Sequence, residues 1–87
     1  MAYVIEIKKS ARRELERLPA KDRRRVATAI SGLSGDPRPH GAIKLTDKGG
    51  EYRLRCGNYR IVYVVFDRQL VVMVIAVDDR KDVSKKR

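Results

Sequence analysis

The chain of 87 residues is long enough for one small domain with a modest hydrophobic core, and we expect a single domain over residues 1–87. It carries 21 Lys and Arg against 11 Asp and Glu, a net charge of +10 that is spread evenly over both halves of the chain. A domain that is cationic throughout predicts an anionic partner. From the charge alone, this partner can be a nucleic acid, an acidic protein or an anionic membrane surface.

Other classes of protein are excluded by the composition. Hydrophobic residues make up 43% of the chain, which is enough for a core and argues against disorder. The longest apolar run, residues 70–77, is too short to span a bilayer, and no signal-peptide pattern opens the chain. Cys56 is the single cysteine and His40 the single histidine, so we expect no disulfide, metal or cofactor. We therefore expect a cytoplasmic protein with no membrane attachment.

The first half of the chain predicts a strand followed by two helices. Apolar and polar residues partly alternate over residues 3–8, as in a strand. Ser10 is the expected N-cap of a first helix, which Pro19 ends. A second helix is expected over about residues 21–33, and a loop rich in Pro and Gly follows at 35–41.

The second half predicts strands. Strands are expected at residues 51–56, 59–66 and 70–77, and residues 42–45 are a candidate for a further short strand. Gly57-Asn58 reads as the two-residue turn of a β-hairpin. The predicted order is β-α-α-β-β-β, an α+β fold in which an N-terminal strand and a helical hairpin precede a mainly antiparallel sheet of about three further strands.

Three arginines of the predicted hairpin share one face. A two-residue turn places Arg55 directly opposite Arg60, and the alternation of side chains along a strand puts Arg53 on the same face. Like charges opposite each other destabilise a sheet, whereas an anion bound between them removes the repulsion. Guanidinium groups also bind phosphate in a bidentate manner. The residues expected on the other face, beneath the helices, are Tyr52, Leu54, Ile61 and Tyr63.

Less specific interpretations of the charged residues remain open. Each hairpin arginine can simply be solvated, or can pair with Glu51 or Asp79. The run Arg23-Arg24-Arg25 cannot converge on one anion, since consecutive residues point about 100° apart around a helix. It is better explained as a solvated helix face or a broad contact with an acidic partner. Cys56 has no histidine placed to activate it, and His40 lies in a loop where we expect it to be solvated.

The string at residues 52–63, YRLRCGNYRIVY, resembles the signature of the RelE/ParE toxin superfamily. Residues 7–19, 36–37 and 76–83 resemble its first strand and helix, its interhelical loop and its C-terminal stretch, so the resemblance covers nearly the whole chain. It implies a compact α+β toxin of a toxin–antitoxin pair. The RelE branch cleaves messenger RNA in the ribosomal A site, and the ParE branch poisons DNA gyrase.

The resemblance also implies roles for individual residues. Arg60 matches the arginine credited with stabilising the scissile phosphate, and Arg80 the C-terminal arginine assigned to leaving-group protonation or phosphate binding. Ser84 stands where the RelE branch commonly has a tyrosine, which is proposed to act as general base. The residues expected to be catalytic are Arg60, Arg80 and Arg55, and those expected to bind RNA are Arg53, Arg55, Lys81 and Lys85.

The resulting hypothesis is a ribosome-dependent endoribonuclease that inhibits translation. Guanidinium groups stabilise charge well but are poor bases because they stay protonated, so the sequence shows half of a cleavage site. A lysine with a lowered pKa or the ribosome would supply the rest. The expected partners are an acidic RelB-like antitoxin, the ribosome and mRNA, and operator DNA for the toxin–antitoxin complex. The alternatives are a gyrase poison of the ParE branch, and a non-catalytic basic module that binds antitoxin and operator DNA.

Overall fold

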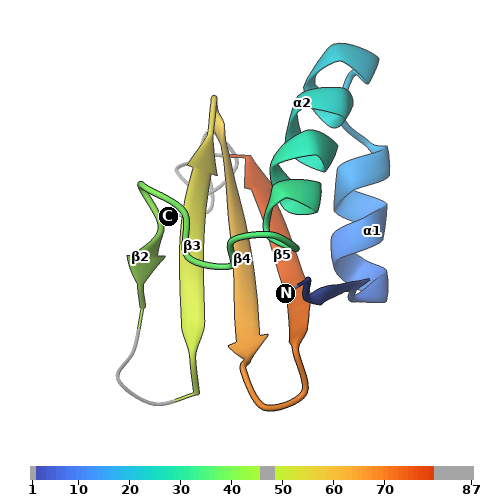
Figure 1. Cartoon of the computed structure of the whole chain (residues 1–87). Helices are drawn as coiled ribbons and strands as arrows, with labels where there is room; N and C mark the ends of the chain where they lie inside the picture. The colour runs from blue at the N-terminus through green and yellow to red at the C-terminus, as the bar shows by residue number, and fades with distance from the viewer. Residues whose placement is uncertain (1, 46–48, 80–87) are drawn as a thin grey trace.

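The computed structural model describes residues 2–45 and 49–79 as two helices and one five-stranded sheet (Figure 1). This confirms the predicted α+β class. In chain order the elements are β1 (Val4–Ile7), α1 (Lys9–Glu16), α2 (Ala20–Gly32), β2 (Ile43–Lys44), β3 (Glu51–Cys56), β4 (Tyr59–Phe66) and β5 (Val71–Asp79).

The strands lie in the order β1-β5-β4-β3-β2. The pairs β5–β4, β4–β3 and β3–β2 are antiparallel, and β1 pairs with β5 in parallel, so the sheet is mainly antiparallel as expected. Four strands follow the helices instead of about three, because the weakly predicted segment at 42–45 does form a strand. It is only two residues long, and its Ile43 pairs with Arg53.

The start of α1 differs from the prediction. Ser10 is not the N-cap: the helix begins at Lys9, and Lys8 occupies the N-cap position without a side-chain cap. The reason is that the backbone N–H of Lys8 donates to the carbonyl of Val74 at 2.8 Å, so Lys8 continues the contact of β1 with β5. The chain thus passes from strand to helix with no linker. Pro19 separates the two helices as predicted.

Both helices cover the same face of the sheet (Figure 1). The helix α1 packs on β5, and α2 reaches over β3 and β4. Tyr63 is fully buried, and its hydroxyl donates to the carbonyl of Pro37 at 2.7 Å. The buried core consists of Ala11, Leu15, Val26, Ile30, Leu33, Tyr59, Ile61, Tyr63, Val65, Val72, Val74 and Val77. Within residues 2–45 and 49–79, no helix has the length and apolar character needed to cross a membrane.

One arginine ties the loop after α2 to the sheet; this loop, which contains residues 36–37, connects α2 to β2 and does not lie between the helices. The Nη2 of Arg38 lies 2.6 Å from Oδ2 of Asp67, and its Nε donates to the hydroxyl of Tyr52 at 2.9 Å. The hydroxyl of Tyr3 donates to Oδ1 of the same aspartate at 2.8 Å. Hydrogen bonds from Arg38 and then from Tyr3 lower the pKa of the Asp67 carboxyl. The loop after α2 is thereby held to β3 and to the β4–β5 turn.

Candidate nucleic-acid interface

The hairpin of β3 and β4 forms with the predicted bounds and register. Cys56 pairs with Tyr59 across the turn, and Arg55 pairs with Arg60. Gly57 has a φ of +61° and occupies the first central position of the turn, where a type II′ hairpin turn requires glycine. The turn chemistry therefore sets the register that places two arginines face to face.

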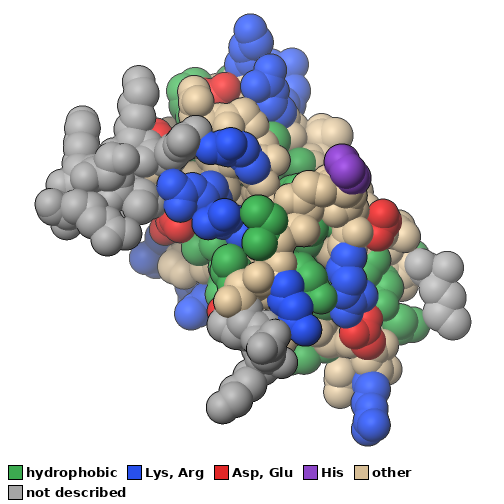
Figure 2. All heavy atoms as spheres, turned by 90° about the vertical axis from the view of Figure 1, so that its left-hand side faces the viewer, with side chains coloured by type: hydrophobic (Ala, Val, Ile, Leu, Met, Phe, Trp, Pro, Cys, Tyr) green, Lys and Arg blue, Asp and Glu red, His purple; other side chains and the backbone are tan. Residues whose placement is uncertain are grey.

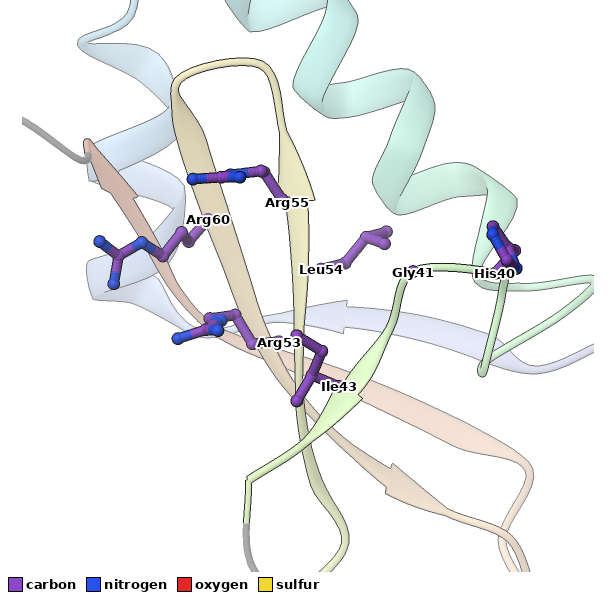
Figure 3. A pocket seen from close by; sticks show the side chains of 7 residues that line it. All are labelled: His40, Gly41, Ile43, Arg53, Leu54, Arg55 and Arg60. Atoms are coloured by element: carbon purple, nitrogen blue, oxygen red, sulfur yellow. The ribbon is translucent and has the colours of Figure 1, made fainter.

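The three predicted arginines extend to the same side of the hairpin (Figure 3). This side is the one that the helices leave uncovered, since the alternate residues Leu54 and Ile61 pack into the core. Arg53 and Arg60 are half-buried, and Arg55 is exposed. Over residues 2–45 and 49–79, none of the three is in an ion pair. The structure therefore brings together three guanidinium groups whose charge no described carboxylate neutralises at contact distance.

A hollow of about 460 Å³ opens beside these arginines, at the edge of β3 beyond the end of β2. His40 and Leu54 lie on the opposite side of β3 from the three arginines (Figure 3). His40 is exposed, as the sequence predicts, but it also contributes to a concave surface, which the sequence did not indicate. The residues that line the hollow are His40, Gly41, Ile43, Arg53, Leu54, Arg55 and Arg60.

The surface around the hollow is cationic with apolar side chains between the charges. Viewed from the β2 edge of the sheet, Lys and Arg side chains occupy several places on this face, and hydrophobic side chains lie among them (Figure 2). Ile43 is 51% exposed and Leu45 is 39% exposed. This mixture of guanidinium groups and exposed apolar surface is suited to phosphates with bases or sugars attached.

The helix α2 anchors the tip of the hairpin. The hydroxyl of Tyr59 donates to Oδ2 of Asp22 at 2.8 Å. Arg25 lies over the turn, so that a Cβ atom placed on Gly57 would come within 3.0 Å of its Nη1. Arg23 is directed elsewhere, because its Nη1 donates to the carbonyl of Glu16 at 3.4 Å. The arginine run therefore does not converge on one anion, as expected, and one of its members supports the hairpin.

A carboxylate that the sequence analysis did not single out faces Arg60 from the neighbouring strand. The register of β4 with β5 pairs Arg60 with Asp78. Simple counting from the β4–β5 turn would have placed Val77 opposite Arg60. A bulge between Val62 and Tyr63 shifts the pairing by one residue. No local pattern in the sequence marks this bulge.

The strand register also shows where Glu51 and Asp79, the two acidic residues considered as partners of the hairpin arginines, stand in the sheet. Glu51 pairs with Val64, at the end of β3 away from the turn, and Asp79 pairs with Tyr59 on the face that the helices cover. Neither residue stands opposite a hairpin arginine.

Comparison with known proteins identifies the chain. The family described as ParE toxin of type II toxin-antitoxin system, parDE, matches residues 5–83. The chain belongs to this toxin family, within the RelE/ParE superfamily. Toxin RelG of Mycobacterium tuberculosis (strain ATCC 25618 / H37Rv) is 30% identical to it in an alignment 87 residues long, which covers 99% of this chain and 100% of RelG. It is thus a RelE-like toxin of a type II toxin–antitoxin system.

Solved structures of RelE toxins share the fold of this superfamily member. A chain of the archaeal RelE–RelB complex from Pyrococcus horikoshii OT3 is 30% identical and superposes with a TM-score of 0.83, over 92% of this chain and 97% of that one. A chain of the intact E. coli RelBE toxin–antitoxin complex is also 30% identical, with a TM-score of 0.76 over 90% of this chain and 96% of that one.

Four predicted site residues of the toxin, Arg80, Lys81, Ser84 and Lys85, lie outside the described residues. Cys56 lies beside the hairpin turn and is half-buried. Burial raises the pKa of its thiol, an effect that Arg25 only partly opposes, and this is unfavourable for a nucleophile. Within the described ranges, no group of three or more His, Cys, Asp or Glu could hold a metal ion.

Proposed function

We propose that this toxin is a ribosome-dependent endoribonuclease that cuts mRNA in the A site and thereby inhibits translation in the cytoplasm. The observation that carries the proposal is the face of β3 and β4 on which Arg53, Arg55 and Arg60 stand together without a carboxylate in contact, over residues 2–45 and 49–79. The similarity to RelG and to the RelE structures supports the RelE branch.

The chemistry of RNA cleavage fits such a face. When the 2′ oxygen attacks the neighbouring phosphorus, negative charge accumulates on the phosphorane oxygens. Guanidinium groups already in place stabilise this charge without reorganisation, and this kind of electrostatic stabilisation is usually the largest single contribution to catalysis. We propose that Arg60 and Arg55 hold the scissile phosphate and that Arg53 binds the neighbouring RNA backbone. Arg80 would assist the leaving group, and Lys81 and Lys85 would contact RNA.

We further propose that an acidic RelB-like antitoxin holds the toxin inactive. The matched structures from P. horikoshii and E. coli are complexes of RelE with RelB. A domain with a charge of +10 attracts an acidic chain at long range, which accelerates association. The exposed residues Arg23 and Arg24 on α2 are candidates for this contact, and the complex would bind operator DNA.

A second function has one specific observation in its favour. The description of the matched family names the ParE toxin of the parDE system. The ParE branch of the superfamily poisons DNA gyrase. The three hairpin arginines, which bind anions but are not bases, also suit a toxin that binds its target without catalysis.

One experiment separates these functions. Purified toxin is added to stalled ribosomes that carry a defined mRNA, and in parallel to gyrase with relaxed plasmid. We expect cuts within the A-site codon, mapped by primer extension, and supercoiling at the rate of the toxin-free control. Intact mRNA together with blocked supercoiling would establish the gyrase poison. Intact mRNA with normal supercoiling would leave a non-catalytic binding module.

A further inference from the structure

We propose that Asp78 is the general base that accepts the 2′-hydroxyl proton during RNA cleavage. This inference rests on the proposed endoribonuclease function and adds to it the reaction step that none of the three hairpin arginines can perform. The arginine residues cannot act as bases, because a guanidinium group stays protonated in proteins. A carboxylate beside the phosphate-binding arginine supplies what is missing.

The geometry comes from the cross-strand register. Arg55, Arg60 and Asp78 stand in one row across β3, β4 and β5, because Arg55 pairs with Arg60 and Arg60 pairs with Asp78. Directly opposite residues of antiparallel strands share a face, with Cβ atoms about 4.5–5.5 Å apart. The three side chains therefore start from the uncovered face of the sheet, with the carboxylate on one side of Arg60 and the second guanidinium on the other.

Two further features suit Asp78 to this role. It is half-buried, so solvent reaches one part of the side chain while the sheet holds the other. Over the described ranges its carboxylate is in no ion pair, and therefore no described partner holds it away from the RNA. The strand beneath it is fixed, because the backbone N–H of Val77 donates to Oε1 of Glu14 on α1 at 2.9 Å.

The charged groups around Asp78 can be named element by element. Arg60 of β4 is its direct neighbour, and Arg55 of β3 stands one strand further on. From α1, the Glu14 carboxylate bonds to the backbone of the preceding residue. Asp79 starts from the opposite face, where it pairs with Tyr59. Asp78 is thus the carboxylate that shares a face and a row with the proposed phosphate-binding pair.

The step balances without a co-reactant. Asp78 takes the proton from the 2′-hydroxyl, the 2′ oxygen forms a bond to phosphorus, and the bond from phosphorus to the 5′ oxygen breaks. Water gives a proton to the leaving 5′ oxygen, and protonated Asp78 returns its proton to solvent. The products are a 2′,3′-cyclic phosphate and a 5′-hydroxyl. His40 is the competing candidate, but it lies beyond Leu54 on the other side of β3 from Arg60 (Figure 3).

The test is single-turnover cleavage on stalled ribosomes at saturating toxin. We expect Asp78→Asn to cleave about 10²- to 10⁴-fold more slowly than wild type, which is the usual contribution of a positioned general base. Glu51→Gln is the matched control, because it also removes one negative charge from the uncovered face of the sheet. Glu51 stands at the end of β3 that is far from the hairpin turn. We expect this control to cleave at the wild-type rate.

Two additional measurements distinguish a base from a residue that only pairs with Arg60. Asp78→Glu should retain more activity than Asp78→Asn, and added formate should accelerate cleavage by Asp78→Ala in proportion to its concentration. Cleavage by Asp78→Asn within about threefold of wild type would overturn the inference and leave the endoribonuclease intact. A slow Asp78→Ala that formate does not accelerate would reduce Asp78 to a positioning role and overturn it too. If the wild-type toxin leaves mRNA whole, the proposed function itself fails, and this inference fails with it.

Discussion

Arg38 and Arg60 are the same type of residue in two different surroundings. Arg38, at the loop end of the sheet, bonds to Asp67 and to the Tyr52 hydroxyl, and its guanidinium carbon lies 5.3 Å from the centroid of that tyrosine ring. Arg60, near the hairpin turn, is in no ion pair within the described residues, and a second arginine stands directly opposite it.

The difference shows how a strongly basic domain divides its charges between stability and function. A neutralised arginine such as Arg38 holds two loops together and has little left to offer an anion. The pairing of Arg60 with Arg55 costs a few tenths to about 1 kcal/mol of sheet stability, which the opposite charge of Asp78 on the other side of Arg60 offsets. Neither neighbour holds the Arg60 guanidinium in an ion pair, so its charge stays available for a ligand. The net charge of the chain cannot distinguish these uses, whereas the strand register does.

Among the variants that test this comparison of Arg38 with Arg60, the largest effect should come from Arg60→Ala. We expect a loss of about 100- to 1,000-fold in single-turnover cleavage on ribosomes, the usual cost of removing one group that stabilises transition-state charge. The melting temperature should change little, because the lost repulsion from Arg55 and the lost attraction to Asp78 act in opposite directions.

The control for this prediction is Arg68→Ala. Arg68 is exposed in the turn between β4 and β5, so its removal changes the net charge equally without touching the hairpin. Normal cleavage by Arg60→Ala, with an unchanged melting temperature, would mean that the hairpin arginines are solvated surface. In that case the different surroundings of Arg38 and Arg60 would not correspond to different functions.

The next effect concerns the turn that sets the arginine register. Gly57→Ala should lower the free energy of unfolding by about 1–2 kcal/mol, because alanine is strained at a φ of +61°. The Arg25 side chain, which lies over the turn, must also move away. Denaturant titration of purified toxin measures the loss.

Gly32→Ala is the matched control. Gly32 ends α2, has no positive φ, and a Cβ there would meet nothing within 4 Å. Its replacement should leave stability unchanged or raise it by up to about 1 kcal/mol. Equal stabilities of the two variants would contradict a strained turn at Gly57.

A smaller effect is expected from Arg38→Ala, the counterpart of Arg60→Ala. The ion pair with Asp67 is largely exposed, with side-chain exposures of 41% and 55%, so water screens it. We expect the melting temperature to fall by up to about 5 °C and single-turnover cleavage to stay within about threefold of wild type. A large loss of cleavage without a change in melting temperature would place Arg38 in the RNA-binding site. It would also remove the distinction between Arg38 at the loop end of the sheet and Arg60 near the hairpin turn.

The smallest effect is the acid sensitivity of Asp67. Its pKa is lowered in the folded toxin by Arg38 and then by Tyr3, so its contribution to stability is present above the unfolded value of about 3.9. That contribution is lost as the pH falls through the lower folded value. Melting temperatures of wild type and Asp67→Asn, measured from neutral pH downward, should therefore converge below about pH 4. A constant difference across this range would contradict the linkage.

Local patterns were sufficient to predict the part of the site that lies in one hairpin. Strand alternation and the Gly57-Asn58 turn involve neighbouring residues only, and the structure confirms both strands, their bounds and the pairing of Arg55 with Arg60. The shared face of Arg53 followed from the same alternation.

Interactions between distant segments could not be predicted in this way. Arg60 faces Asp78 only because of the bulge at Val62, and the sequence carries no turn or glycine signal there. The pairing of Arg38 with Asp67 joins two loops that are remote in sequence. The Ser10 cap failed for a similar reason, since the contact of Lys8 with β5 determines where α1 begins.

The position of β5 within the sheet has a consequence for how the toxin acquires its activity during synthesis. β1 pairs with β5 and with no other described strand, so the first strand has no neighbour until the last one has left the ribosome. The same late strand carries Asp78 to the side of Arg60. A growing chain therefore has its arginine hairpin before it has a closed sheet, and pairing between ends so distant in sequence is slow to form. The proposed target of the toxin is the ribosome that synthesises it, and this topology delays the complete site until β5 has been made and has paired with β1 and β4.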